Sequence, residues 1–225
     1  MRWNVTCSAP WRLYVIIDRA AAGSRDLPAL ADAAIRGGAD FVQLRDKTAS
    51  HREFLREAKR VIAVTRRAGV ALVINDRIPV ARAIGADGVH LGQDDVAIAV
   101  ARRRLGPGRL IGKSTHSLAQ AFAAQGEGAD YIGFGPIFPT PTKPDYGSIG
   151  TRSIRSVAQS LTIPVVCIGG IDAQNLAEVL GAGADRVAVV RAVCAADDPE
   201  SAARRLKQII EQFHRERDGS LATRV

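Results

Sequence analysis

The sequence predicts an α/β fold, a single (β/α)8 TIM barrel with parallel strands. Short apolar segments alternate with longer, alanine-rich segments eight times along the chain. The tripeptide Gly-Ala-Asp recurs before every second apolar segment, which indicates a repeat of two strand–helix units. A chain of 225 residues suffices for one such barrel. Because alternating strands and helices form parallel sheets through right-handed crossovers, eight of these units can close on themselves.

Each strand and helix is predicted from a local pattern. The strands are the apolar runs at 13–17, 41–44, 71–74, 88–91, 110–112, 131–134, 165–168 and 186–190. Helices are predicted at 27–36, 51–68, 79–84, 118–125, 174–180 and 199–214, and two more end near 105 and 160. Ser50 is a suitable N-cap for the helix at 51–68, and Gly69 is a suitable stop.

The four aspartates of the repeat are predicted to be structural. They are Asp40, Asp87, Asp130 and Asp185. In each tripeptide the glycine ends a helix, and the aspartate caps the turn into the next strand. These turns lie at the N-terminal ends of the strands, which is the face of a barrel opposite to its chemistry.

An open doubly wound sheet is the alternative fold. It typically carries a glycine-rich phosphate loop after the first strand, and Asp18-Arg19-Ala20 is not such a loop. The closed barrel is therefore preferred. Its domain plan is an N-terminal extension at 1–12, a catalytic barrel at 13–214 and a flexible, charged C-terminal tail at 215–225.

Composition and charge narrow the classes of function. The formal charge is +8 and the pI is about 10.0, but the arginines are spread over several predicted helices. Without a basic arm or an aromatic stacking platform, nucleic-acid binding is disfavoured, and a basic surface that attracts small anions is preferred.

Three distant cysteines favour a reducing, cytoplasmic location, and neither a signal peptide nor a membrane span is expected. Aromatic residues are only 5%, so aliphatic residues are expected to fill the core.

Polar residues of catalytic type follow six of the eight predicted strands. In this fold the chemistry lies at the C-terminal strand ends. The residues concerned are Gln43, Arg45 and Lys47, then Asn75 and Asp76, Gly92 to Asp95, Lys113 to His116, Gly135 to Lys143, and Gly169 and Gly170. Since alternate side chains of a strand share a face, Gln43, Arg45 and Lys47 are expected to point one way, and Leu44 and Asp46 the other.

The charges at these strand ends suit a metal and a diphosphate. Asp76 and Asp95 would converge from neighbouring strands, and two carboxylates with water and phosphate oxygens form an ordinary Mg²⁺ site. Arg45, Lys47 and Lys143 would oppose them. Cations around one point stabilise the charge that develops on a diphosphate leaving group.

A second anion site is predicted around Gly169 and Gly170. Phosphate sites in this fold form after the seventh and eighth strands, where glycine lets backbone N–H groups approach a ligand. Thr140 and Thr142 could donate hydroxyls to the same phosphate. The proline-rich loop at 135–150 is expected to act as a lid that excludes water.

No nucleophile with an attendant base is evident. Cys167 lies in an apolar strand and is expected in the core. His116 could serve in acid–base chemistry or in orienting the site, and His90 is expected inside the barrel. His51 and His214 look like surface helix positions. Two phosphorylated sites and one metal imply that two substrates are joined, one of them activated by diphosphate.

Six segments follow one another in the chain: Gln43-Leu44-Arg45-Asp46-Lys47, Asn75-Asp76, residues 88–95, Ser114-Thr115-His116, residues 133–143 and Ile168-Gly169-Gly170-Ile171. With these segments the chain resembles the thiamine phosphate synthase family from about residue 13 to 213. This resemblance implies that hydroxymethylpyrimidine diphosphate loses pyrophosphate while the nitrogen of a thiazole phosphate attacks the methylene carbon, in a dissociative substitution assisted by Mg²⁺.

The resemblance also implies a role for each matching residue. The pyrimidine diphosphate would be bound by Gln43, Leu44, Arg45, Asp46, Lys47, Asn75, Ser114 and Lys143. Of these, the catalytic groups would be Arg45, Lys47, Ser114 and Lys143. Mg²⁺ would be held by Asp76 and Asp95. The thiazole phosphate would be bound by Thr140, Pro141, Thr142, Gly170, Val190 and Arg191.

Two positions depart from the family pattern, and two other functions are alternatives. Asp46 stands where the family often has Glu, and Arg191 stands at a position where the side chain is usually small.

A sister family, the thiazole tautomerases, shares Ser114-Thr115-His116 and the Gly-Gly turn, but tends to lack the metal aspartates. A basic nucleic-acid-binding protein is the other alternative. The sequence specifies no oligomeric state.

Overall fold

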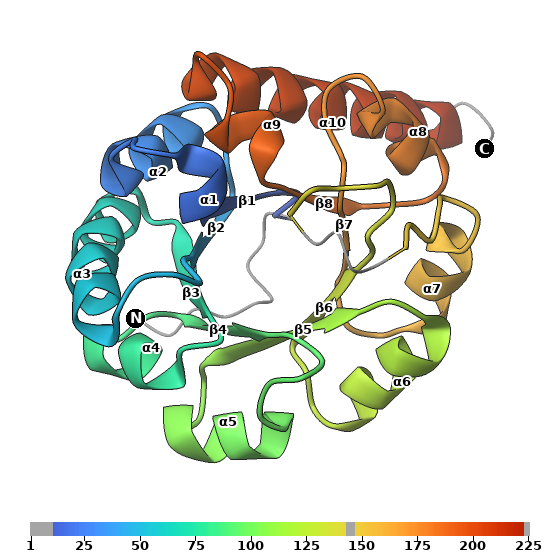
Figure 1. The fold of residues 1–225 in the computed structure, drawn as a ribbon. Coiled ribbons are helices and arrows are strands. Elements are labelled where there is room, and N and C mark those ends of the chain that lie inside the picture. Colours follow the sequence, from blue (N-terminus) through green and yellow to red (C-terminus); the bar gives the residue numbers. More distant parts are fainter. Residues whose placement is uncertain (1–10, 143–146, 223–225) are drawn as a thin grey trace.

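Eight parallel strands form a closed barrel. The computed structural model describes residues 11–142 and 147–222, the last three through their backbone only. The strands are β1 (Leu13–Asp18), β2 (Phe41–Arg45), β3 (Ala71–Asn75), β4 (Gly88–Leu91), β5 (Leu110–Thr115), β6 (Tyr131–Phe134), β7 (Val165–Ile168) and β8 (Arg186–Val189). Each strand pairs in parallel with its neighbours in sequence, and β8 pairs with β1 (Figure 1). The predicted (β/α)8 fold is confirmed.

Helices surround the barrel. They are α1 (Arg19–Ala22), α2 (Leu27–Arg36), α3 (His51–Ala68), α4 (Ile78–Ile84), α5 (Ile98–Leu105), α6 (Leu118–Gly126), α7 (Ile154–Ser160), α8 (Leu176–Gly181), α9 (Arg191–Cys194) and α10 (Pro199–Ala222). Ser50 caps α3 through a capping box with Glu53, and Gly69 ends the helix in the left-handed region, as predicted. Within the described residues, no helix is both long and apolar enough to cross a membrane.

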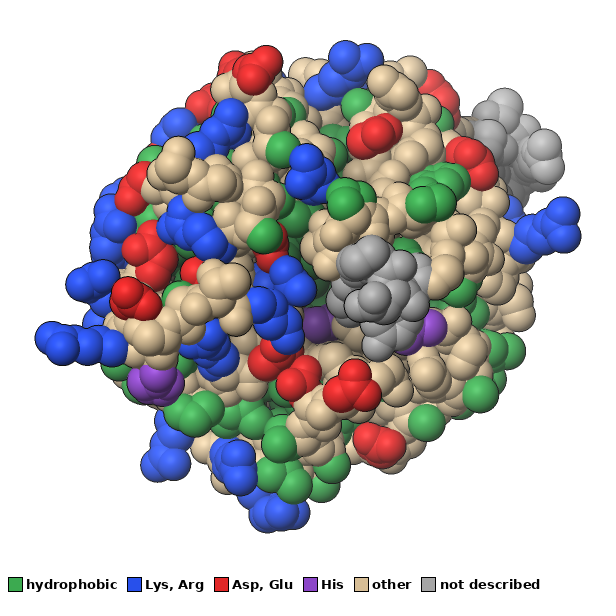
Figure 2. All heavy atoms as spheres, in the orientation of Figure 1, with side chains coloured by type: hydrophobic (Ala, Val, Ile, Leu, Met, Phe, Trp, Pro, Cys, Tyr) green, Lys and Arg blue, Asp and Glu red, His purple; other side chains and the backbone are tan. Residues whose placement is uncertain are grey.

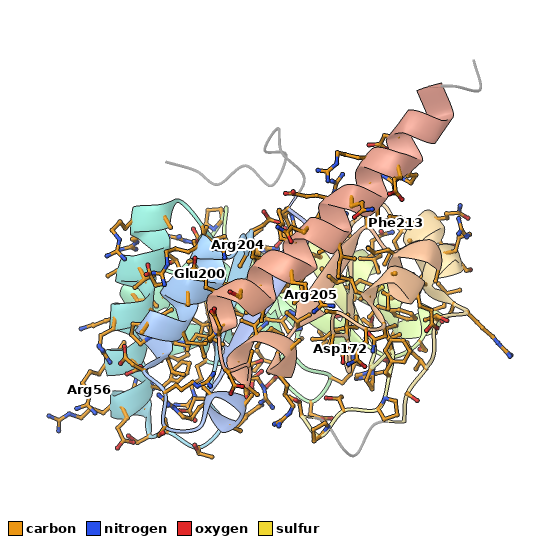
Figure 3. All side chains as sticks on the ribbon, turned by 90° about the horizontal axis from the view of Figure 1, so that it is seen from above. Arg56, Asp172, Glu200, Arg204, Arg205 and Phe213 are labelled. Atoms are coloured by element: carbon orange, nitrogen blue, oxygen red, sulfur yellow. The ribbon has the colours of Figure 1, made fainter. Side chains whose placement is uncertain are left out.

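Three features differ from the predicted elements. The short helices α1 and α9, which directly follow β1 and β8, were not predicted, because four residues carry no helical periodicity. The strand β5 runs on to Thr115, since Ser114 and Thr115 stay paired with β6. Helix α10 continues beyond the predicted end at His214 to Ala222, and Arg217 on this extension is 2.8 Å from Asp185. Figure 3 shows α10 lying along α2 and α8.

The repeated aspartates lie at the N-terminal rim of the barrel. Asp40 accepts hydrogen bonds from the backbone N–H groups of Arg12 and Leu13, at 2.8 and 2.9 Å. Asp87 accepts from Leu72 N at 2.8 Å. The remaining two are Asp130, which accepts from Ile111 N at 2.7 Å, and Asp185, whose partner is Arg217. The first three therefore tie the start of one strand to the turn before the next, in the structural role predicted for them.

The core has two layers of different composition. Aliphatic side chains fill the layer between strands and helices. Inside the barrel, however, Trp11, Tyr14, Phe41 and Tyr131 form an aromatic cluster, with the Trp11 and Phe41 ring centroids 4.8 Å apart. Aliphatic residues were expected throughout, and Trp11 was assigned to an extension outside the barrel. The few aromatic residues are thus concentrated where a barrel must be filled from a small number of inward positions.

Candidate active site

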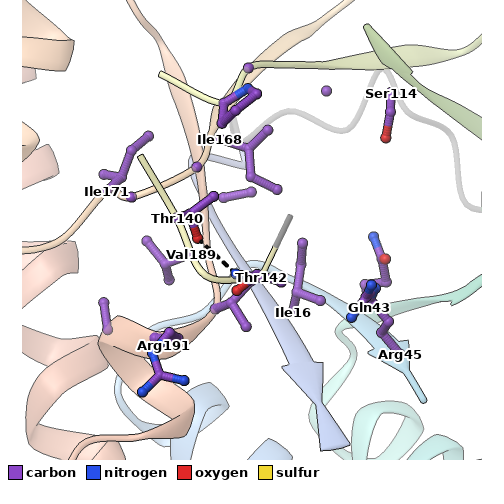
Figure 4. Close-up of a pocket in the computed structure, with 18 of the residues that line it drawn as sticks. Ile16, Gln43, Arg45, Ser114, Thr140, Thr142, Ile168, Ile171, Val189 and Arg191 are labelled. Carbon is purple, nitrogen blue, oxygen red and sulfur yellow. Dashed lines mark hydrogen bonds between the residues drawn. The ribbon is translucent and has the colours of Figure 1, made fainter. Parts of the chain in front are cut away.

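A cavity of about 470 Å³ opens at the C-terminal ends of the strands. This volume lies within the range of about 300–1,000 Å³ that is usual for small-molecule sites. Figure 2 shows basic and acidic side chains together beside the central hollow of this face. The close-up in Figure 4 shows two walls, with Gln43, Arg45 and Ser114 on one side and Thr140, Thr142 and Arg191 on the other. The cavity therefore lies at the face that the sequence predicted.

The first wall begins at the end of β2. Gln43 and Arg45 line the cavity, whereas Leu44 is fully buried in the layer between strands and helices. The Asp46 carboxylate instead accepts hydrogen bonds from the backbone N–H groups of Thr48 and Ala49, at 2.8 and 3.0 Å. The predicted alternation of side chains is confirmed for these residues. Neither Leu44 nor Asp46 lines the cavity.

Arg45 is held by Asp18, a site residue that was not predicted. Arg45 Nη1 forms an ion pair with Asp18 Oδ2, and only 3% of the Asp18 side chain is exposed. The other oxygen of Asp18 caps α1, accepting from Ala21 N at 3.0 Å. Asp18 follows the apolar run of β1, so the rule of polar residues after a strand would have found it. Its double anchoring fixes the direction of the guanidinium at the cavity.

Asp76 and Asp95 lie side by side next to the first wall. The pKa of Asp76 is raised, mainly by burial and then by the neighbouring carboxyl of Asp95. The ion pair with Lys47 lowers this pKa but does not cancel the other two effects. Asp76 has φ 57°, and among the described residues no other non-glycine residue has a positive φ. Such strained positions concentrate at functional sites. Lys47 does not line the cavity but reaches Asp76, so it neutralises part of the carboxylate pair.

The donor set of this pair fits a hard divalent cation. In the part of the chain that the structure describes, no cluster of three or more His, Cys, Asp or Glu side chains is present. Among these residues the pair would supply two carboxylates, and water and ligand oxygens would complete the coordination shell of a bound ion. This is the way in which Mg²⁺ usually binds beside phosphate groups. Two carboxylates whose proximity raises a pKa are also stabilised by a cation between them.

The strand β5 contributes Ser114, and the turn that follows it contributes His116. Ser114 Oγ lies 3.0 Å from His90 Nε2, and Gln93 Nε2 donates to the Ser114 carbonyl. The backbone N–H of His116 donates to Gln120 Oε1 at 2.7 Å, while its Nδ1 contacts the Gly135 carbonyl oxygen. A carbonyl only accepts, so His116 Nδ1 carries a proton. The ring is thereby oriented at the cavity, in keeping with an orienting role.

The second wall is built from the loop after β6 and the turn after β7. Thr140, Pro141 and Thr142 line the cavity, and Thr142 N donates to Thr140 Oγ1 at 3.3 Å. At Gly170, φ is 64°, and an added Cβ would lie 2.7 Å from Phe138 Cβ and from the Pro139 carbonyl oxygen. Glycine is therefore required here, because the base of the loop packs directly on the turn.

The remaining predicted residues are placed as follows. Asn75 lines the cavity at the end of β3, and Val190 and Arg191 line it at the start of α9. Lys143 lies outside the described residues. Cys167 is fully buried, in the core as predicted, and burial raises the pKa of its thiol to about 12, which disfavours the reactive thiolate. His214, expected at the surface, is only 2% exposed because α10 packs against the neighbouring helices α2, α8 and α9.

Fold and cavity together define an enzyme built on a (β/α)8 barrel with its site at the C-terminal strand ends. A family model described as thiamine monophosphate synthase matches residues 13–193. The chain belongs to this family. It is 51% identical to the thiamine-phosphate synthase of Chloroflexus aurantiacus over 201 residues, covering 89% of this chain and 93% of that protein. It is 43% identical to that of Shouchella clausii, covering 90% and 98% of the two chains.

Solved structures agree with this assignment. The structure of thiamine phosphate pyrophosphorylase from Pyrococcus furiosus superposes with a TM-score of 0.83 at 39% identity, over 90% of this chain and 96% of that one. A synthase of (S)-3-O-geranylgeranylglyceryl phosphate from Thermoplasma acidophilum superposes with a TM-score of 0.68 at 17% identity, which shows the shared fold alone. The two curated relatives named above are synthases, so the tautomerase alternative gains no support from them.

Proposed function

We propose that this protein is a thiamine-phosphate synthase that joins hydroxymethylpyrimidine diphosphate to a thiazole phosphate and releases pyrophosphate. The observation that carries the proposal is the cavity with two polar walls, in a chain of this family. One wall holds cationic and amide groups beside a carboxylate pair, and the other holds a glycine turn with two threonines. Two walls of this kind suit two anionic substrates held with their reacting ends together.

The pyrimidine diphosphate is assigned to the first wall. Gln43 and Ser114 are assigned to the ring, and Arg45, Lys47 and Asn75 to the diphosphate, with Lys143 completing the set of cations. Asp18 supports this role indirectly because it fixes the direction of Arg45. Leu44 and Asp46 would contribute backbone contacts only.

Mg²⁺ is assigned to Asp76 and Asp95, whose paired carboxylates fit it. When bound, the ion would stabilise negative charge on the diphosphate oxygens. Lys47, which pairs with Asp76, is exposed enough to turn toward the diphosphate when a cation takes over the neutralisation of the carboxylates. The cations of the first wall would then lie around the leaving group.

The thiazole phosphate is assigned to the second wall. Thr140 and Thr142 can donate hydroxyls, and Gly170, which lines the same wall, lets the base of the loop pack directly on the turn. Val190 and Arg191 border the same region, and the Arg191 guanidinium would add a cation where most members of the family have a small side chain. Pro141 restricts the loop, which lowers the entropy lost on closure.

The reaction breaks one C–O bond and forms one C–N bond. The bond between the pyrimidine methylene carbon and the diphosphate oxygen breaks, and its electron pair leaves with pyrophosphate. The lone pair of the thiazole nitrogen then forms the new bond to that carbon. No protein nucleophile is needed, which agrees with the buried, unreactive Cys167. The protein holds the substrates together, excludes water and stabilises the leaving group.

The direct test is a two-substrate assay. The purified protein, Mg²⁺ and both phosphorylated precursors should yield pyrophosphate and thiamine phosphate in equal amounts, and omission of either precursor should stop the reaction. No product under these conditions would contradict the proposal. Since the described cysteines, Cys167 and Cys194, are buried free thiols, we also propose that the reaction takes place in the cytoplasm.

A further inference from the structure

Five polar side chains form a continuous hydrogen-bonded chain across the barrel interior. Gln43 Nε2 donates to the Tyr14 hydroxyl at 2.5 Å, and the Tyr14 and Tyr131 hydroxyls are 3.1 Å apart. The Tyr131 hydroxyl lies 3.1 Å from His90 Nδ1, and His90 Nε2 lies 3.0 Å from Ser114 Oγ. We call this set the interior chain. Its two ends, Gln43 and Ser114, both line the cavity.

The middle of the interior chain is deeply buried. Tyr14 and Tyr131 are 2% and 1% exposed and pack among the rings of Trp11 and Phe41. A buried hydroxyl without a partner is costly, so each link holds its neighbours in place. Burial also raises the pKa of both phenols above the usual value, so both keep their protons.

The backbone of β5 makes room for the chain. A Cβ at Gly112 would lie 2.2 Å from Tyr131 Cζ and 2.5 Å from His90 Nδ1. Any side chain at this position would therefore separate the two groups. Glycine is a poor strand residue on entropic grounds, and its presence at a buried strand position usually marks a close approach of other atoms. Here the atoms that approach are those of the hydrogen bond between Tyr131 and His90.

The direction of the four hydrogen bonds follows from the first one. An amide nitrogen only donates, so the Tyr14 oxygen accepts from Gln43 and its proton goes to Tyr131. The Tyr131 proton then goes to His90 Nδ1, and a neutral His90 carries its own proton on Nε2 and donates to Ser114. The Gln43 carbonyl oxygen is thereby turned away from Tyr14, and the Ser114 proton away from His90.

We propose that Tyr14 and Tyr131 are positioning residues: Tyr14 directly fixes Gln43 as an acceptor toward the pyrimidine ring, and Tyr131, through His90, fixes Ser114 as a donor toward it. This rests on the proposed function for the identity of that ring. An aminopyrimidine presents both a donating amino group and accepting ring nitrogens, so a fixed acceptor and a fixed donor select its orientation. The reacting methylene group would then face the second wall.

Removal of single hydroxyls tests the proposal. Tyr14→Phe and Tyr131→Phe keep the rings but break the interior chain, so the KM for the pyrimidine diphosphate should rise about tenfold, as expected for loss of an oriented hydrogen bond. The KM for the thiazole phosphate should stay within about twofold, because the second wall is untouched. The double variant should have about the same KM for the pyrimidine diphosphate as either single variant, since one break already interrupts the interior chain.

The matched control is Phe41→Leu, which perturbs the same aromatic cluster without removing a hydroxyl. It should lower the melting temperature and leave the ratio of the two KM values unchanged. If the tyrosine variants raise both KM values equally, or neither, while melting like Phe41→Leu, then the tyrosines are merely packing residues and the proposal is overturned.

The protonation of His90 gives a readout that does not depend on activity. In the free protein labelled with ¹⁵N-histidine, NMR should find His90 with its proton on Nε2, and Tyr131→Phe should abolish this preference. A His90 protonated on Nδ1 would reverse the direction of the chain and overturn the proposal. If the wild-type protein made no thiamine phosphate, the proposed function would fail, yet the His90 measurement would still test the interior chain.

Discussion

Aspartates at the two rims of the barrel differ in how the protein satisfies them. At the N-terminal rim, Asp40, Asp87 and Asp130 each accept hydrogen bonds from backbone N–H groups of a strand. At the C-terminal rim, Asp76 and Asp95 lie against each other, and the pKa of Asp76 is raised by burial and by this neighbour. The first three are complete within the chain. The second pair is satisfied only in part, by the Lys47 ammonium on Asp76 and by Gly92 N, which donates to Asp95 at 2.7 Å, and the raised pKa of Asp76 shows that the two carboxylates still repel each other.

The largest expected effect is a loss of kcat when an aspartate of the C-terminal rim, rather than of the N-terminal rim, is substituted. Asp76→Asn and Asp95→Asn should each lower kcat by about 100-fold or more, because charge stabilisation of the leaving group is lost. Asn tolerates the left-handed backbone of residue 76, so the fold should persist. The control Asp87→Asn should keep kcat within about twofold but destabilise the protein by about 1–2 kcal/mol. Pyrophosphate release and urea unfolding measure the two effects, and equal losses of kcat at both rims would contradict the comparison.

A smaller effect is expected from aspartates that cap helices. Asp18→Asn should lower kcat/KM for the pyrimidine diphosphate about tenfold, since a partly buried arginine loses its charged partner and its direction. Asp26 is the matched control, because it also caps a helix and pairs with an arginine, Arg60, but lies at the surface. Asp26→Asn should leave kcat/KM unchanged. Steady-state kinetics measure kcat/KM in both variants. Similar losses of kcat/KM would show that loss of a helix cap, and not the contact with Arg45, causes the effect.

The role of Gly170 in the second wall can be distinguished from the general cost of backbone strain at a glycine with positive φ. Gly170→Ala should raise the KM for the thiazole phosphate several-fold, because the new Cβ would push the base of the loop away from the turn. Gly69→Ala is the control, since Gly69 has φ 70° but no atom within 4 Å of an added Cβ. Both variants should lose stability, by about 1 kcal/mol from strain. A normal KM in Gly170→Ala would remove this turn from the site.

The smallest effect is a pH dependence of stability at the N-terminal rim. Burial, then the charges of Arg12 and Arg217, lower the pKa of His214 from 6.5, against opposing contributions of Asp185 and Asp218. Below pH 6.5 the unfolded chain therefore binds a proton that the folded chain rejects, so stability falls with decreasing pH until the folded pKa is reached. His214→Phe should flatten this slope and leave kcat unchanged. An unaltered slope in calorimetric scans would refute the assignment.

Much of the site could be predicted from sequence because strand order alone brings strand ends together. Gln43, Arg45, Asn75 and Ser114 were placed correctly at one cavity by this rule. The same rule also covers Asp18, the polar residue at the end of β1, but Asp18-Arg19-Ala20 was considered only as a possible phosphate loop and its role beside Arg45 was missed. The rule also ended β5 too early, because Lys113 is polar although the strand remains paired with β6.

The interior of the barrel could not be predicted in the same way. Strand β1 is buried along its whole length, so its sequence is apolar on both faces and does not show which face points inward. Tyr14 and Tyr131 therefore could not be assigned to the inside, nor to each other. Their contact depends on the register of strands far apart in sequence, and on the room that Gly112 leaves.

Binding of pyrophosphate is the most direct test of the division between the rims. Because the proposed metal site offers two carboxylates among the described residues, and phosphate oxygens would complete the coordination shell, pyrophosphate and Mg²⁺ should bind together. Calorimetric titration of the protein with pyrophosphate should give an affinity at least about tenfold higher with Mg²⁺ than without it. This gain should be retained in Asp87→Asn and lost in Asp76→Asn. An equal gain in Asp76→Asn would contradict the account, because the carboxylate pair would then not hold the metal.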